Sequence, residues 1–198
     1  MKLLGGFVCL LAVTTATAAL CESSGTCASG LTVPVEAGMR LAIDSKPAEL
    51  DVEGTDAREM RITCTLNDTE RAGEVRIRFH ARDGKGKLTI SGGPSNNVHL
   101  VIQIPHQTHL LMRMPAGAVH VKDVTGDKDV DVHAGELTIT GVNPQEYRSI
   151  DASVDIGEVQ ASAFSVDKGG FFRSFKRSTG EGLYRLDAHI ITGSIRLN

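Results

Sequence analysis

The sequence predicts an all-β protein, a single domain of short stacked strands with a β-solenoid-like repeat, and a β-sandwich is the alternative fold. Three observations lead to this prediction. Apolar and polar residues alternate with a period of two along most of the chain, as in strands with one buried face. Turn signals separate the alternating runs at intervals of about 8–12 residues. In the second half, glycines recur every nine residues, at Gly117, Gly126 and Gly135.

The first half contains the clearest strand pattern. In the run 75–80, three apolar side chains fall on one face and alternate with Arg76, Arg78 and His80. Glycine-rich turns at 83–86 and 92–97 separate later runs, and Pro105 and Pro115 are expected to end two strands. The same alternation predicts strands at residues 41–43, 49–52, 61–66, 87–90, 98–104 and 109–114.

The second half favours the solenoid-like arrangement. Each run between the glycines is too short to bury its own apolar face, so successive runs must stack on a shared core. We therefore expect Val121, Val130 and Ile139 to lie in one apolar stack. The pattern returns at 150–159 and 186–197, and the intervening stretches, from Gly141 to Ile150 and from Phe164 to Leu183, are predicted to be side loops.

The N-terminal residues predict export. A basic start precedes an apolar run at 3–13, which is too short to span about 30 Å of hydrocarbon, and Ala16-Thr17-Ala18 forms an A-x-A cleavage pattern. We expect a signal peptide at 1–19, a flexible segment at 20–30 and the β domain at 31–198. No later apolar stretch has the length of a membrane span.

Cleavage would leave Cys21, Cys27 and Cys64. In an oxidising compartment, either Cys27–Cys64 or Cys21–Cys27 can pair. Alternatively, Cys21 is the lipid-anchored first residue of a lipoprotein, although Leu20 precedes it where a lipobox has a small residue. Cys64 also shares the apolar phase of its strand and can be a small buried core residue.

Several segments, taken in order along the chain, resemble a known protein family. The succession of 38–43, 101–105, the glycines of period nine and the ending 192–197 resembles the bacterial putative-adhesin family over residues 31–198. The resemblance implies a repeat-built β fold in the cell envelope. It supplies no catalytic residues that can be transferred to this chain.

Composition and motifs predict neither an enzyme nor a cofactor or metal site. The net charge of −3 gives no basic footprint for nucleic acid, and the absence of Trp leaves few platforms for stacking sugars. Two groups come near to metal-ligand spacing, but strand alternation makes both more typical of solvated surface. These groups are the aspartates at 123, 127, 129 and 131, and the histidine pairs His106 with His109 and His120 with His133.

Two segments are candidate interaction sites. The basic strand at 76–82, with Lys85 and Lys87, suits an anionic partner such as polysaccharide or lipid headgroups, or protects a sheet edge. The second segment, 169–177, is either a cover for the core or a partner-binding loop. Its candidate residues are Phe171, Phe172, Arg173, Phe175, Lys176 and Arg177.

These observations predict a non-catalytic cell-envelope or surface binding and scaffold protein of the putative-adhesin type. The alternative is a periplasmic regulatory or structural envelope component that binds a protein partner. The sequence does not identify the envelope or surface partner.

Overall fold

The computed structural model describes residues 21–94, 97–164 and 166–198, and all of their side chains except those of 166–172. The predicted signal peptide at 1–19 lies outside the described residues. The elements, in chain order, are β1 (Cys21–Thr26), β2 (Leu31–Pro34), β3 (Arg40–Ser45), β4 (Ala48–Thr55), β5 (Glu59–Leu66), η1 (Thr69–Glu74), β6 (Arg76–Arg82), β7 (Lys85–Ser91), β8 (Val98–Pro105), β9 (His109–Lys122), β10 (Lys128–Thr140), β11 (Tyr147–Ala161), η2 (Ser162–Phe164), β12 (Val166–Ser178) and β13 (Tyr184–Leu197).

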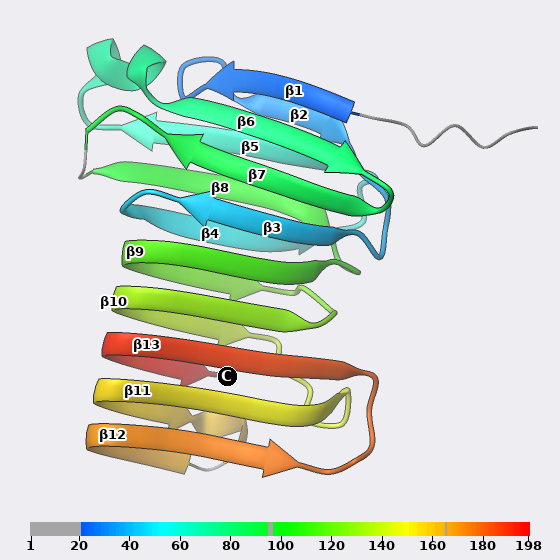
Figure 1. Ribbon diagram of the computed structural model, residues 1–198, viewed down its shortest axis with the longest axis vertical. Coiled ribbons are helices and arrows are strands. Elements are labelled where there is room, and N and C mark those ends of the chain that lie inside the picture. The colour runs from blue at the N-terminus through cyan, green and yellow to red at the C-terminus, as the bar shows by residue number, and fades with distance from the viewer. Residues whose placement is uncertain (1–20, 95–96, 165) are drawn as a thin grey trace, which may run out of the picture.

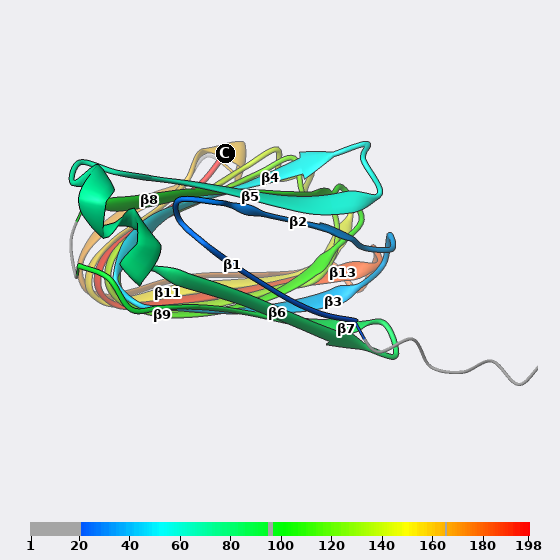
Figure 2. The ribbon, with the colours of Figure 1, turned by 90° about the horizontal axis from the view of Figure 1, so that it is seen from above.

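Nearly all elements are strands, which confirms the predicted all-β fold. The strands form two facing layers (Figures 1 and 2). We call them the front layer and the back layer. Strands β9 to β13 cross from one layer to the other and so belong to both. The front layer continues upward from the first half of β9 as β3, β7, β6 and β1, and the back layer continues from its second half as β4, β8, β5 and β2.

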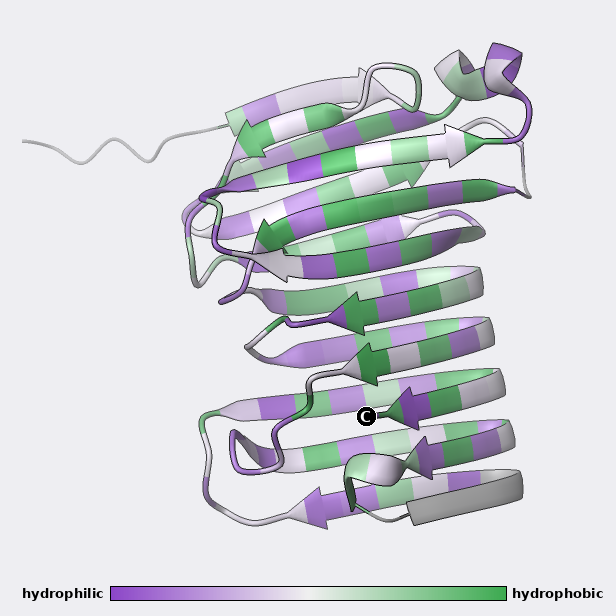
Figure 3. Cartoon of the chain, turned by 180° about the vertical axis from the view of Figure 1, so that it is seen from behind, coloured by the Kyte–Doolittle hydropathy of each residue, from purple (hydrophilic) through white to green (hydrophobic). Residues whose placement is uncertain are grey.

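A column of glycines allows the long strands to bend. Gly117, Gly135, Gly193 and Gly157 are register partners on successive strands. Their φ angles lie between 132° and 145°, and a Cβ on any of them would overlap the carbonyl oxygen of the neighbouring strand. Only glycine can take this backbone conformation at so close an approach. The bends therefore stack along one edge of the molecule (Figure 3).

The period of nine corresponds to half of one turn of the stack. Gly117 and Gly135 are 18 residues apart and occupy the same bend, whereas Gly126 lies at the opposite edge, beside Thr108. The predicted single stack of Val121, Val130 and Ile139 is therefore wrong in detail. Val121 pairs with Ile139 in the back layer, while Val130 pairs with Met112 in the front layer and faces them across the core.

Strand order differs from chain order in the lower half of the stack. The C-terminal strand β13 lies between β10 and β11 and is parallel to both. The next strand outward is β12, antiparallel to β11, and it occupies the region between Phe164 and Leu183 where we predicted a side loop. That loop prediction is wrong, because glycines and charges within 166–178 mask the strand alternation. Of the other predicted loop, from Gly141 to Ile150, residues 141–146 lie outside the strands, and the remainder belongs to β11.

The seven strands predicted between residues 41 and 114 are all present, with small shifts at their ends. Two local expectations were not met. Pro115 lies inside β9 and does not end it. Residues 20–30, predicted to be flexible, include β1, which pairs with β6 along all six of its residues.

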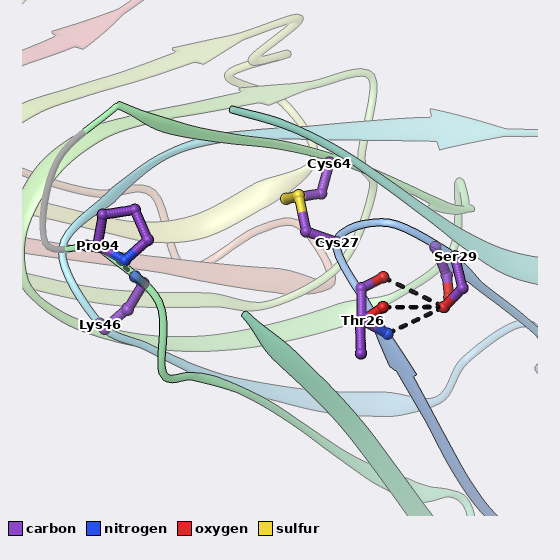
Figure 4. The surroundings of a disulfide bond; sticks show 7 residues. Thr26, Cys27, Ser29, Lys46, Cys64 and Pro94 are labelled. Atoms are coloured by element: carbon purple, nitrogen blue, oxygen red, sulfur yellow. Dashed lines mark hydrogen bonds between the residues drawn. A yellow bond between two sulfur atoms is a disulfide. The ribbon is translucent and has the colours of Figure 1, made fainter. Parts of the chain in front are cut away.

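A disulfide joins Cys27 to Cys64, with their Cα atoms 4.9 Å apart (Figure 4). Cys27 follows β1 of the front layer, and Cys64 belongs to β5 of the back layer, so the bond ties the two layers together near the upper end. Cys21 is a free thiol. The 37-residue separation of the bonded cysteines corresponds to about 4 kcal/mol of stabilisation in the chain-entropy picture.

Candidate binding surfaces

The aspartates and histidine pairs that come near to metal-ligand spacing in the sequence do not form a metal-binding arrangement among the described residues. His106 contacts the carbonyl oxygen of Asp123, and His109 contacts the carboxylate of Asp127. His120 lies on the back layer, while His133 precedes the bend in β10. Within residues 21–94, 97–164 and 166–198, no three His, Cys, Asp or Glu side chains are arranged to hold a metal ion.

A shallow groove runs along the edge where the strands bend, and we call it the bend-edge groove. It consists of two adjoining cavities of about 570 and 790 Å³, which meet where Gly117 pairs with Gly135. From β9 to β11 the groove has a floor of backbone, because the glycine column leaves no side chains there. It passes over β5, β8, β4, β9, β10, β13 and β11 in that order.

The two lips of the bend-edge groove differ in chemistry. The residues that precede the glycines form an apolar lip, in which Ile156 is 46% exposed. The residues that follow them form an acidic lip, where Arg196 lies 3.0 Å from Glu136 and 3.9 Å from Glu158. The apolar lip is formed by Ala116, Ala134, Thr192 and Ile156, and the acidic lip by Glu49, Glu136, Ser194 and Glu158.

Next to this groove, three side chains of the back layer form a cluster. His99 Nε2 lies 2.7 Å from Asp51 Oδ2, and His120 Nδ1 lies 3.1 Å from Asp51 Oδ1. The Oδ1 atom is shielded from solvent and accepts no hydrogen bond from the residues described. One carboxylate thus links imidazoles on β8 and β9, the strands that flank its own strand, β4.

Charges on the outer surface of the front layer are separated along the stack. Basic side chains are in excess at the upper end, although Glu22, Asp44 and Asp83 also lie there. Acidic side chains are in excess at the lower end, although Arg113, Lys176 and Arg185 pair with three of them. Basic side chains of the upper end are Arg76, Arg78, His80, Arg82, Lys85, Lys87 and Arg40. Acidic side chains of the lower end are Asp129, Asp131, Asp151, Asp155 and Asp187.

The candidate partner segment 169–177 lies within β12, the last strand of the stack. Phe175 is 8% exposed, and its ring centre lies 4.9 Å from that of Phe164. The guanidinium of Arg177 lies over the Phe164 ring, and Lys176 pairs with Asp151 at 2.7 Å. Phe175 thus closes the lower end of the core. The side chains of Phe171 and Phe172 lie outside the described ones, so the partner role of this segment stays a prediction.

Comparison with known proteins gives a likeness of fold. No protein-family model matches the chain, and no curated protein sequence matches it. A solved structure of a putative cell adhesion protein from Clostridium sporogenes matches with a TM-score of 0.51 at 14% sequence identity, over 90% of this chain and 99% of that one. At this identity the two proteins share an architecture. The described residues contain no helix with the length and hydrophobicity that a membrane crossing requires.

Sequence reasoning missed a buried polar pair at the edge opposite the bends. Lys128 is 2% exposed, donates hydrogen bonds to the hydroxyl of Tyr147 and the carbonyl of Gly126, and lies 5.0 Å from the centre of the Tyr147 ring. Burial lowers the pKa of Lys128 to about 8, although Glu146 and Asp127 oppose the shift. Burial also raises the pKa of Tyr147. Strand alternation was the available signal, because Lys128 shares the inward phase of Val130 and Val132.

Proposed function

We propose that this chain is an exported, non-catalytic binding and scaffold protein of the cell envelope or surface, of the putative-adhesin type. The disulfide between the layers supports an oxidising compartment. The fold is shared with a putative cell adhesion protein. The stack of strands supplies a rigid support for long, continuous surfaces.

The bend-edge groove is the observation that carries this proposal. Seven strands about 4.8 Å apart make it roughly 30 Å long, which matches about nine or ten residues of an extended polypeptide. Successive side chains of an extended segment point to opposite sides, so one set would meet the apolar lip and the other the acidic lip. The occupant that fits is an extended segment in which apolar and cationic residues alternate.

The acidic lip favours a cationic partner by simple charge balance. Among the described residues that line the groove, Glu49, Glu136 and Glu158 outnumber the one Lys or Arg, which is Arg196. The ion pairs of Arg196 with Glu136 and Glu158 are partly exposed, so each contributes little free energy. An incoming lysine or arginine can therefore take the place of Arg196 beside one of these glutamates. Apolar contact with Ile156 adds stabilisation in proportion to the area that it removes from water.

A peptide-binding experiment tests the groove. A labelled ten-residue peptide of alternating Lys and Val should bind, and a Glu and Val peptide should not, as measured by fluorescence anisotropy. Ala134→Trp fills the groove from the apolar lip and should weaken binding at least about tenfold. Thr63→Trp, on an exposed position of β5 outside the groove, is the matched control. Equal binding of both peptides, or binding unaffected by Ala134→Trp, would contradict this site.

Location separates this proposal from the alternative, a periplasmic regulatory or structural component. Antibody labelling or protease treatment of intact cells should reach a surface protein, whereas a periplasmic one is protected until the envelope is opened. Intact-mass measurement of the recovered chain should place its first residue at Ala19 or Leu20. A diacylglycerol adduct on Cys21 would instead establish the lipoprotein.

A further inference from the structure

One row of side chains crosses the outer surface of the front layer from the basic end to the acidic end. Register pairs connect its members strand by strand, and we call it the Leu111 row. In spatial order it consists of Glu22, His80, Lys87, Ala42, Leu111, Asp129, Asp187, Asp151 and Lys176. Its inner members change along the stack from basic, through apolar, to acidic, and its two end members, Glu22 and Lys176, carry charges opposite to each other.

The centre of the row coincides with the centre of the stack. Leu111 lies on β9, the fifth of the nine strands in the front layer. This leucine is 41% exposed. Lys87 lies two strands from Leu111 toward the upper end, and Asp187 lies two strands from it toward the lower end.

Each end carries a net charge that the chain neutralises only in part. Among the described residues, Arg40, Arg76, Arg78 and Lys85 take part in no ion pair within 4 Å. At the acidic end, Asp129, Asp151 and Asp187 pair with Arg113, Lys176 and Arg185, whereas the ion-pair partner of Asp131 and Asp155 among the described residues is His189, at 3.8 and 3.6 Å. A surplus of opposite sign thus remains on each side of Leu111.

We propose that the front layer is the interface of a symmetric dimer, and that its partner is a second copy of this chain. The two-fold axis would run parallel to the strands above Leu111. Such an axis reverses the stack direction, so each basic end faces the acidic end of the other copy. Leu111 then meets its own counterpart, and Lys87 faces Asp187 of the second copy.

The available area suits a stable dimer. Nine strands about 4.8 Å apart, each presenting about six residues of about 3.3 Å, give a face of roughly 40 by 20 Å. This is about 800 Å² per partner, the size of a standard specific interface. A small apolar centre surrounded by charge is the usual plan of such surfaces.

A second copy fits this surface better than a polyanion does. A polyanion lying along the front layer would gain at β6 and β7 but would be repelled by the aspartates of β10, β13 and β11. The back layer provides the comparison, because its outward acids and bases are interspersed, as at Glu49, Asp51, Lys122 and Arg196.

Charge exchange tests the dimer by sedimentation velocity. The unaltered chain should dimerise at about 50 mM salt. The dissociation constant of the dimer should be at least about tenfold higher at about 500 mM salt, where screening is strong. Lys87→Asp and Asp187→Lys should each weaken the dimer at least about tenfold. The double variant should restore it, because the axis places these positions opposite each other. Leu111→Arg should weaken the dimer, and Thr138→Arg on the back layer should not.

Other outcomes would overturn the proposal. One is a chain that stays monomeric at low salt, and another is a dimer that the double variant fails to restore. If the chain were monomeric and bound a sulfated polysaccharide, and Arg78→Glu abolished that binding, the basic end would instead be a polyanion site. Thermal melting of each variant reports whether it is folded. Ala134→Trp should leave the dimer intact and Lys87→Asp should leave peptide binding intact, so that failures of the dimer and the groove are distinguishable.

Discussion

The upper and lower halves of the stack build the same two-layer core with different connections. In the upper half, each pair of facing strands is joined by a separate segment. Lys46 and Pro47 join β3 to β4, residues 92–97 join β7 to β8, and η1 joins β5 to β6. In the lower half, β9 to β13 are continuous strands of 13 to 15 residues. Four of them, β9, β10, β11 and β13, each bend at one glycine. A disulfide secures the upper half, and close backbone approach defines the lower half.

The difference shows where each half tolerates change. A joining segment can vary in length without disturbing the strand pairs, because connections lie at the surface. A glycine bend cannot vary, because each bend lies against the carbonyl oxygen of the next strand. The lower half therefore depends on residue identity at a few positions, and the upper half depends more on a covalent bond.

The largest effect is expected from Gly135→Val. Its Cβ would overlap the carbonyl oxygen of Gly117, and valine is unfavourable at a φ of 140°. The overlap involves backbone on both sides, so it cannot be relieved by moving a side chain. We expect the free energy of unfolding, measured by chemical denaturation, to fall by about 4 kcal/mol or more. Gly73→Ala is the control, since no atom lies within 4 Å of the added carbon. Equal stability of the two variants would refute the role of the glycine column.

A smaller effect is expected from removing the disulfide with Cys27→Ala and Cys64→Ala. The unfolding free energy should fall by about 4 kcal/mol at most. The disulfide stabilises the protein mainly by restricting the unfolded chain, and its removal leaves the rest of the apolar core in place. Hydrogen exchange should show faster opening of β1, β2, β5 and β6, while β10 and β13 keep their protection. Uniform loss of protection would mean that the two halves unfold as one unit and that the comparison does not extend to stability.

Local features of the fold could be predicted from sequence, and non-local ones could not. Alternation in 75–80 and 98–104 reports burial on one face, which each strand carries in itself. Nothing local indicates that β13 is inserted between β10 and β11, because that order depends on contacts between distant segments. The period of nine was visible, but it does not tell half a turn of the stack from a whole one.

The candidate surfaces follow the same division. The basic strand was evident in the sequence, whereas its acidic counterpart comes from three strands that are adjacent only in space. The bend-edge groove was not predicted, since it arises from the alignment of glycines far apart in the chain. Lys128 could have been found from its inward phase, but a lone lysine in a strand is ordinarily taken as exposed.

The smallest effect, and one of opposite sign, is expected from Lys128→Met in the lower half. Burial lowers the pKa of Lys128 from 10.5 to about 8, so the unfolded chain binds this proton more tightly than the folded chain does. The lysine therefore destabilises the fold fully below about pH 8, and the cost is relieved as the pH rises from about 8 to 10.5. The shift corresponds to about 3 kcal/mol, from which the lost hydrogen bonds to Gly126 and Tyr147 must be subtracted.

Lys128→Met should then stabilise the protein by about 1–2 kcal/mol at pH 7. The gain should disappear near about pH 9 and reverse by about pH 10.5, where only the lost hydrogen bonds remain. The measurement is the difference in unfolding free energy between variant and parent across this range, which cancels the titration of groups that both proteins share. Lys122→Met, at an exposed position on β9, should change stability by less than about 0.5 kcal/mol at any pH. If Lys128→Met were destabilising at pH 7, the hydrogen bonds to Tyr147 and Gly126 would outweigh the burial of the charge. The lower half would then depend on a polar contact as well as on its glycine bends.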